Sequence, residues 1–462
     1  MCVRVRTLGR RWPGLSPKST LLTVPTPHPT SNKTGHMAHD SPSHTAHAQA
    51  LSRFIDEAPS PFHVVANAAA MLSDAGFVDS ATADDPSGRF FRIQDGSILA
   101  WVVPKDAPKN APFRVIGAHT DSPNLHLKPT PQADAYGYRR LGVETYGGVL
   151  LNSWLDRDLS LSGRIAVREG SEVAMKLVKI DRPILRIPQL AIHLDREISN
   201  KGLLLNKQTH MAPIYGLSQN QSGDIWDVIA DSVDVAKADI IGSELMLHDT
   251  APSQLIGVDE EFISAPRLDN QLSCHSALTA ISGVTAESHI PVIALFDHEE
   301  VGSVSATGAA TTALPRLLES ITTSLGGSAD DHGQALAESL FISADNSHAT
   351  HPNYPERHEP NHHIALNAGP VLKHNSNQRY TTTAKSEAMF HLAAEKAGVQ
   401  TQAFVSRSDM PCGSTIGPTV SAMLAMTALD VGCAQLAMHS CREMAGTNDP
   451  WEMTLLLAEL LG

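Results

Sequence analysis

The chain has 462 residues, enough for two domains with sizeable cores, and its 42% hydrophobic and 18% charged residues are typical of a soluble globular protein. A formal net charge of -14 disfavours nucleic acids and anionic membranes as partners, and no apolar run approaches the roughly 20 residues that span a bilayer. The five cysteines are few and odd in number, which predicts a reduced, cytoplasmic protein rather than a disulfide framework.

The N-terminal segment differs from the rest of the chain because its first 36 residues carry basic side chains and no acid. Repeated prolines disfavour a helix there, and the continuous apolar core of a secretory signal is missing. We expect residues 1–48 to be disordered or an extension upstream of a true start at Met37, with an organelle transit peptide as a further alternative. His39, His44 and His47 suggest a metal-binding tract, but their irregular spacing favours a disordered tail.

Two helices are predicted ahead of the first catalytic strand. Apolar spacing predicts one helix that begins near Ala50 and ends before Pro59, and a second, Ala-rich helix that continues through Leu72. The catalytic strands begin near Arg114. Residues 49–128 are therefore expected to form the first part of a catalytic domain.

The pattern changes between residues 129 and 264. Segments 164–168 and 173–180 alternate apolar and polar residues, which predicts strands with one solvent-facing side. We expect residues 129–264 to form an inserted β-rich domain that mediates subunit association, and residues 265–462 to complete the catalytic domain. Helix and strand patterns alternate in that last part, so the predicted fold class is α/β, with an α/β/α sandwich as the catalytic domain.

Histidines and acids follow strand-like segments at several places. Three apolar runs, at 113–118, 290–296 and 339–344, are typical of buried strands, and a shorter run occupies 435–438. In open α/β sheets, ligands bind beyond the carboxyl ends of the strands. We therefore expect one crevice that contains the residues following these runs, together with an acid that begins a helix. These residues are His119, Glu299, Glu300, Asp345, His439 and the helix-initiating Asp269.

This donor set suits a pair of divalent metal ions at a catalytic centre. A structural zinc site would favour cysteines and four protein ligands, whereas a catalytic site leaves room for water. Two ions about 3.5–4 Å apart can clamp the attacking and leaving oxygens of a hydrolysis. We expect His119 and Asp345 to bind one ion, Glu300 and His439 to bind the other, and Asp269 to bridge them. Taken singly, each residue has a plainer role in packing or helix capping, but they share one kind of structural position.

Two further acids are candidate catalytic residues. Successive side chains of an extended segment point in opposite directions, so Glu299 can face the attacking water while Glu300 binds metal. Glu299 is expected to act as the general base, taking a proton from that water and passing it to the leaving amine. Asp121, two residues after His119, is placed to orient that imidazole.

Several separated motifs resemble the aspartyl aminopeptidase family of dinuclear zinc metallopeptidases. They extend in the same order from about Ala50 to the C-terminus, which makes the resemblance specific. The motifs are Gly-Ala-His-Thr-Asp-Ser-Pro-Asn at 117–124, Tyr-Gly-Gly at 146–148, Trp-Leu-Asp-Arg-Asp-Leu at 154–159, Arg-Pro-Ile-Leu-Arg-Ile-Pro at 182–188, Asp-His-Glu-Glu-Val-Gly-Ser at 297–303, Asn-Ser-Asn-Gln-Arg-Tyr at 375–380 and Ser-Arg-Ser-Asp-Met-Pro-Cys-Gly-Ser-Thr-Ile-Gly-Pro at 406–418.

The resemblance implies the same five metal ligands, with Glu299 as the catalytic glutamate and Asp121 in support. It implies that the two ions are Zn²⁺, although Co²⁺ and Mn²⁺ also suit carboxylate and imidazole ligands. It further implies a large homo-oligomer, commonly a dodecamer. In such an assembly, His193 of one subunit would reach the substrate site of another.

Substrate preference depends on a second group of residues. An acidic first side chain needs a cation in its pocket, and Lys373 is the candidate, supported by the resemblance. Its plainer reading is a solvated surface lysine, and Arg379 and Arg407 are weaker candidates. We therefore predict a metal-dependent aminopeptidase that acts on the N-terminal residue of peptides, preferably Asp or Glu.

Other functions use the same residues. Some members of the family prefer neutral N-terminal residues, and a metal-dependent amidase or deacylase would need only the same ligands and base. Outside enzymes, a metal-stabilised scaffold that binds peptides is the remaining alternative, and the presence of Glu299 argues against it.

The start at Met37 is testable by intact-mass analysis of the native protein. We expect the measured mass to be that of a chain whose N-terminus is at or near Met37. A native N-terminus at Met1 would contradict the hypothesis.

Overall fold

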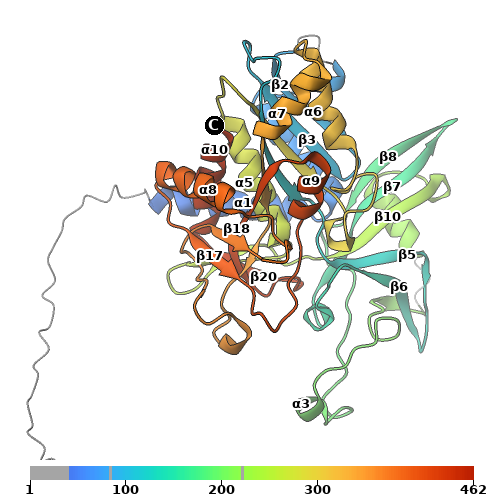
Figure 1. Cartoon of the computed structure of the whole chain (residues 1–462). Helices are drawn as coiled ribbons and strands as arrows, with labels where there is room; N and C mark the ends of the chain where they lie inside the picture. Colours follow the sequence, from blue (N-terminus) through green and yellow to red (C-terminus); the bar gives the residue numbers. More distant parts are fainter. Residues whose placement is uncertain (1–40, 83–85, 220–222) are drawn as a thin grey trace, which may run out of the picture. The chain divides into compact units, whose positions relative to one another are not determined.

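The largest element of the computed structural model, which describes residues 41–82, 86–219 and 223–462, is a mixed sheet of nine strands (Figure 1). Strands β13, β4, β14 and β18 are parallel to one another, so their carboxyl ends lie along one edge. In spatial order the strands are β1 (Val78–Asp79), β2 (Gly88–Gln94), β3 (Ser97–Val103), β13 (Ile290–Phe296), β4 (Phe113–His119), β14 (Leu340–Ala344), β18 (Thr427–Gly432), β16 (Val371–His374) and β17 (Gln402–Val405).

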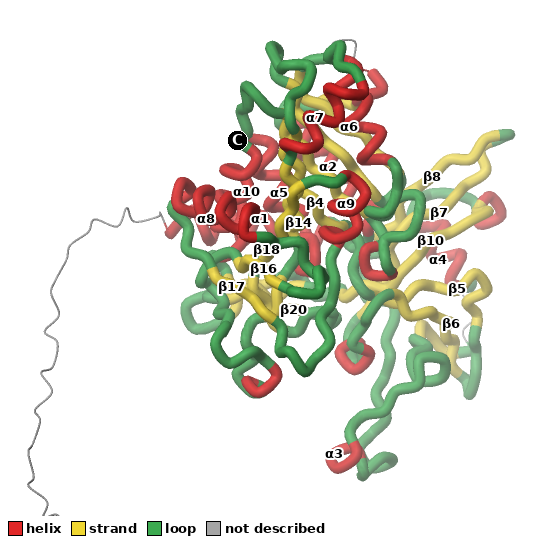
Figure 2. Tube along the Cα trace, viewed as in Figure 1, coloured by secondary structure: helices red, strands yellow, loops and turns green. Residues whose placement is uncertain are grey.

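Helices cover both faces of this sheet (Figure 2). Alternate residues of β13 show why the strand is apolar throughout: Ile293 and Leu295 pack into one core, and Val292 and Phe296 into the other. The first core contains side chains of α1 (Ser41–Glu57), α2 (Pro61–Asp74), α5 (Leu268–Gly283), α8 (Ala384–Ala397) and α10 (Asp449–Leu461), and the second contains side chains of α6 (Ala313–Ser324), α7 (Ala329–Glu338) and α9 (Ile416–Leu424). This arrangement confirms the predicted α/β/α sandwich.

A second, antiparallel sheet of six strands comes from the middle of the chain. Its order is β8 (Glu172–Lys179), β7 (Leu159–Glu169), β10 (Ile240–Asp249), β5 (Asn124–Gln132), β6 (Tyr138–Tyr146) and β9 (Ile214–Leu217). It has its own core, in which Leu161 and Leu247 pack near Ile229 of α4 (Ile225–Ser232). A single turn of helix, α3 (Ile198–Lys201), lies between β8 and β9.

The strands of this sheet do not coincide with the segment 129–264 that was expected to form the insert. The sheet begins earlier, at Asn124, and ends at Asp249. The strands that follow, β11 (Gln254–Ile256) and β12 (Phe262–Ala265), join a small third sheet with β20 (Glu443–Gly446), β19 (Ala434–Leu436) and β15 (Ser347–His348). Because Asp40–Gly462 form one compact unit, the division into 49–128, 129–264 and 265–462 stays a prediction.

The N-terminal helix corrects part of the expected disordered segment 1–48. Helix α1 already begins at Ser41, and the side chain of His47 is buried. The His47 ring packs against His275 and Trp451, and its Nε2 lies 3.2 Å from Thr454 Oγ1. Burial lowers the pKa of His47 to about 4, so the neutral imidazole packs as an aromatic ring rather than as part of a tail or a metal tract. Residues 1–40, with Met37 and His39, lie outside the described residues.

None of the helices in the described part of the chain has the length and apolarity that crossing a membrane requires. The cysteines described there, Cys274, Cys412, Cys433 and Cys441, are free thiols.

Candidate metal centre

Strand register brings the predicted ligands to one edge of the nine-stranded sheet. His119 is the last residue of β4 and pairs with Phe296, the last residue of β13. The chain beyond β13 turns into a short 3-10 helix, η4 (Glu299–Val301), and Asp345 follows β14 directly. Asp269 lies in the first turn of α5, and His439 lies in the loop between β19 and β20. Segments far apart in sequence therefore meet beyond the carboxyl ends of parallel strands.

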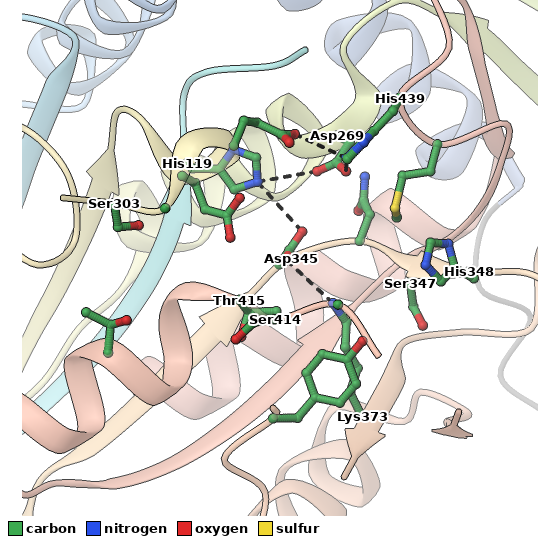
Figure 3. Close-up of a pocket in the computed structure, with 18 residues that line it drawn as sticks. His119, Asp269, Ser303, Asp345, Ser347, His348, Lys373, Ser414, Thr415 and His439 are labelled. Carbon is green, nitrogen blue, oxygen red and sulfur yellow. Dashed lines mark ion pairs between the residues drawn. The ribbon is translucent and has the colours of Figure 1, made fainter. Parts of the chain in front are cut away.

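Asp269 lies between the two histidines, as Figure 3 shows. His119 Nε2 is 3.4 Å from Asp269 Oδ1 and 3.7 Å from Asp345 Oδ1. On the other side, His439 Nε2 is 3.5 Å from Asp269 Oδ2 and 3.3 Å from Glu300 Oε1. Each oxygen of Asp269 thus faces a different imidazole. The candidate ligand atoms of these two groups lie within 4.8 Å of one another, close enough to hold a metal ion, and so do those of a third group, His119, Glu299 and Glu300.

Hydrogen bonds orient both imidazoles. His119 Nδ1 donates to the backbone oxygen of Asp121 at 3.0 Å, and His439 Nδ1 donates to the backbone oxygen of Gly148 at 3.2 Å. A Cβ on Gly148 would lie 3.0 Å from His439 Nδ1, a tight contact that would push on the ring, so glycine favours this close approach. With Nδ1 engaged, Nε2 of each ring faces the carboxylates, as in histidines that bind metals.

The charges of the site favour a bound cation. Burial alone would lower the pKa of His119, but Asp121, Asp269 and Asp345 raise it well above its usual value. Burial likewise tends to lower the pKa of His439, but Asp269 and Glu300 outweigh it and raise that pKa to about 11. The surrounding acids thus favour positive charge at both rings, and a divalent cation can supply that charge.

The carboxylates themselves are crowded and incompletely partnered. Burial, with repulsion from neighbouring acids, raises the pKa of Glu299 to about 8 and that of Glu300 to about 7. Asp269 Oδ1 and Glu300 Oε1 are buried and accept no hydrogen bond in the structure. Buried acceptors without donors are costly, and a metal ion would satisfy both. The residues present therefore fit a metal centre made of imidazole and carboxylate ligands.

Asp121 holds the two glutamates in place. Its carboxylate accepts the backbone N–H groups of Glu299 and Glu300, each at 3.1 Å, and the hydroxyl of Tyr146 at 2.7 Å. Its Oδ1 also lies 3.4 Å from His119 Nδ1. The acid after β4 is therefore connected to the turn after β13 and to the end of β6.

A cavity of about 480 Å³ adjoins the cluster and is lined by Glu299 and Lys373. Lys373 is only 2% exposed, so the alternative of a solvated surface lysine is wrong. Its Nζ lies 3.7 Å from Asp345 Oδ2 and 5.3 Å from the centre of the Tyr380 ring. Arg407 instead pairs with Asp409 outside this cavity.

His193 is a predicted substrate-binding residue that its own chain does not bring to the cavity. It lies in the loop between β8 and α3, where its side chain is exposed, and it does not line the cavity. Large apolar neighbours in the same loop are exposed too: Leu190, Ile192 and Leu194 are 58%, 51% and 75% exposed.

Sequence reasoning missed two residues that support the site, Tyr146 and Glu443. The carboxylate of Glu443 accepts the backbone N–H groups of Asp269, at 2.9 Å, and His439, at 2.7 Å. The available signal was a single acid at the start of a short, otherwise apolar strand, where a buried charge requires a partner. Tyr146 was noticed only as part of a glycine-rich motif.

Comparison with known proteins places this α/β fold and its carboxylate–histidine cluster in a family. The model of the aminopeptidase I zinc metalloprotease family (M18) matches residues 54–460. A "probable M18 family aminopeptidase 2" of Streptomyces coelicolor is 46% identical over 412 residues, which cover 87% of this chain and 95% of the relative. A protein of the same name from Mycobacterium leprae is 48% identical over 410 residues, covering 87% and 96%.

Solved structures agree. The structure of the Ape4 and Nbr1 complex matches with a TM-score of 0.87 and 37% identity, over 91% of this chain and 86% of that chain. The S. cerevisiae mApe1 dodecamer matches with a TM-score of 0.78 and 26% identity, over 90% and 96%. The chain belongs to the M18 family of zinc metalloaminopeptidases, which confirms the family resemblance.

Proposed function

We propose that this protein removes the N-terminal residue of peptides, preferably Asp or Glu, by a hydrolysis that uses two divalent metal ions and Glu299 as general base. The observation that carries the proposal is the placement of Asp269, whose two oxygens face His119 and His439 on opposite sides. A carboxylate in that position suits a ligand shared by two ions.

The metal ligands follow from this geometry. His119 and Asp345 would hold one ion, Glu300 and His439 the other, and Asp269 both. The family description favours Zn²⁺, and Co²⁺ and Mn²⁺ suit the same ligand types. When bound, the two ions supply Lewis acidity that polarises the scissile carbonyl and lowers the pKa of water.

Glu299 is the group that moves the proton. It lines the cavity beside the cluster and is not one of the five proposed ligands, and its raised pKa suits a base that later acts as an acid. It takes a proton from the attacking water and delivers it to the leaving amine. Asp121 keeps the backbone of Glu299 and Glu300 in place and orients His119, so it supports the reaction.

Lys373 supports the preference for acidic residues. A buried ammonium group at the wall of the cavity is suited to pair with a substrate carboxylate. Its present neighbour, Asp345, is a proposed metal ligand at 3.7 Å, which leaves donor positions of Lys373 for the substrate.

Assembly into a homo-oligomer, of the dodecameric type seen for mApe1, would complete the site. The middle segment exposes large apolar side chains of the kind that subunit interfaces cover. They include Val173 and Met175 of β8 as well as Leu190, Leu194 and Leu204. In the oligomer, His193 of one subunit would reach the cavity of another and contact the substrate. The cytoplasm is the expected location.

Alternatives keep the same metal centre. A preference for neutral N-terminal residues would leave the hydrolysis unchanged and remove the role of Lys373. A metal-dependent amidase or deacylase would use the same ligands on small amidated acids, and a metal-stabilised peptide-binding scaffold would not need Glu299.

Replacing the base tests the reaction. Glu299→Gln removes the proton acceptor but keeps the side-chain volume, so we expect kcat to fall roughly 10²- to 10⁴-fold with little change in bound metal. The measurement is the release of para-nitroaniline from Asp-, Glu-, Leu- and Lys-para-nitroanilide, before and after metal chelation. Full activity in the variant, or activity that resists chelation, would reject the mechanism. No release from any substrate by metal-loaded protein would favour the amidase or the scaffold.

Lys373→Met tests substrate preference. Loss of a charge-assisted hydrogen bond, about 1.5–3 kcal/mol, should lower kcat/KM for Asp-para-nitroanilide relative to Leu-para-nitroanilide by roughly 10- to 100-fold. Taking the ratio cancels any shared effect on the nearby metal ligands. The matched control is Lys105→Met, at an exposed lysine outside the cavity. An unchanged ratio would assign the acidic preference elsewhere.

His193 is tested together with the oligomeric state. We expect the wild-type protein to sediment as a large homo-oligomer, and His193→Ala to keep that size while losing activity. Mixing inactive Glu299→Gln subunits with His193→Ala subunits should restore part of the activity, because a histidine from one chain then meets an intact base in another. A fully active monomer would contradict the contribution in trans.

A further inference from the structure

Strained backbone lies at or just before two of the proposed metal ligands. His439 itself has φ +67°, and Arg267, two residues before Asp269, has φ +55°. The left-handed region costs a residue other than glycine roughly 1–2 kcal/mol. Such conformations persist where the surrounding structure holds them. A group that contacts both turns would hold Asp269 and His439 at the separation that a shared metal ion requires.

Glu443 contacts both turns at once. One oxygen, Oε2, accepts the N–H of Asp269 at 2.9 Å, and the other, Oε1, accepts the N–H of His439 at 2.7 Å. The position of Glu443 is itself fixed, because β20 pairs with β12 and places Glu443 opposite Ala265. A single side chain thus connects the start of α5 with the loop before β20.

The position of this carboxylate is costly for stability alone. Glu443 is 2% exposed, and it forms no ion pair with any lysine, arginine or histidine of the described chain. Burying a carboxylate costs several kcal/mol, and this one lies beside the acid Asp269, with the charges of Arg267 and His439 offsetting only part of the cost. Both of its oxygens accept backbone N–H groups of proposed ligands, so the position of Glu443 is suited to holding those ligands in place.

We propose that Glu443 is a positioning residue that fixes the separation of Asp269 and His439. It thereby determines the affinity for the metal ion that Glu300 and His439 would hold. The proposal rests on the proposed function, since it takes these two residues as ligands. Glu443 acts through backbone N–H groups and does not line the cavity. Asp121 holds the backbone of Glu299 and Glu300 in the same way.

The two ions should respond differently when this contact is lost. His439, Asp269 and Glu300 form one group of candidate ligands, and Glu443 holds the first two directly, with His439 Nε2 3.5 Å from Asp269 Oδ2. The other group shares Asp269 but takes His119 from β4 and Asp345 from the end of β14. Loss of Glu443 is therefore expected to weaken one site strongly and the other only slightly.

The experiment compares Glu443→Gln with Asp449→Asn. Glutamine keeps the shape of the side chain but presents an NH₂ group to one of the two backbone N–H groups. Asp449 is the matched control: it is fully buried and accepts the N–H groups of Asn367 (2.8 Å) and Gly369 (3.0 Å), yet it does not line the cavity. Zn²⁺ is titrated into each metal-free protein by calorimetry, and urea unfolding of the metal-free proteins is measured in parallel.

In Glu443→Gln we expect one of the two zinc sites to weaken roughly 10- to 100-fold, the size of effect seen when groups that support metal ligands are removed. The other site should change by much less, and Co²⁺-loaded protein should show an altered absorption spectrum. In Asp449→Asn we expect both zinc affinities and the spectrum to stay those of the wild type, whatever the loss of stability.

Three results would overturn the proposal. They are unchanged zinc affinity in Glu443→Gln, an equal loss in Asp449→Asn, and a loss shared evenly by both sites. If Glu443→Gln does not fold, Glu443→Asp is used, because its shorter side chain cannot span both N–H groups. If that variant also fails to fold while Asp449→Asn folds, Glu443 serves the fold and the proposal is rejected. A wild-type protein that binds no zinc at this cluster would instead reject the proposed function. If the wild type and Glu443→Gln bind zinc with the same affinities, only the role of Glu443 is rejected.

Discussion

The structure depends on gathering negative charge where water is scarce. Carboxylates from distant parts of the chain meet at one edge of the main sheet, and taking each one out of water costs several kcal/mol unless opposite charge or donors surround it. Backbone N–H groups, two imidazoles and one buried lysine offset part of that cost, and the unpartnered oxygens mark what is left for cations to offset. These acids are Asp121, Asp269, Glu299, Glu300, Asp345 and Glu443.

The second sheet takes part in this centre within the same chain. Tyr146, at the end of β6, donates its hydroxyl to Asp121, and the backbone oxygen of Gly148 receives His439 Nδ1. The ring of His126 on β5 stacks on Tyr146 with the ring centres 4.6 Å apart. These contacts with the antiparallel sheet therefore restrain His119 and His439, two of the proposed metal ligands. Any movement of this sheet against the main sheet would alter the orientation of both histidines.

The sequence was sufficient for the parts of the site that local pattern controls. Apolar runs that end in His119 or Asp345 identify buried parallel strands, and parallel strands bring their carboxyl ends together without further information. Local pattern marks Glu443 only as an acid in an apolar strand and could not reveal its role, because one of its two partners, Asp269, lies 174 residues away in the chain. The start of α1 was missed for a related reason: His47 looks polar in sequence and becomes an apolar packing group only against Trp451. Whether the β-rich segment ends at 264 or earlier depends on strand pairing, which composition does not encode.

The order β3-β13-β4 has a consequence for how the polypeptide is made. Strand β13 lies between two strands that precede it by the whole of the β-rich segment. A ribosome releases β3 and β4 long before β13, so the centre of the main sheet stays open during synthesis and cannot close early. The antiparallel sheet, whose neighbours are nearer in sequence, is able to form first. Until β13 has been synthesised, the edges of β3 and β4 are free to pair with other strands. Chaperones would therefore be needed most during this interval.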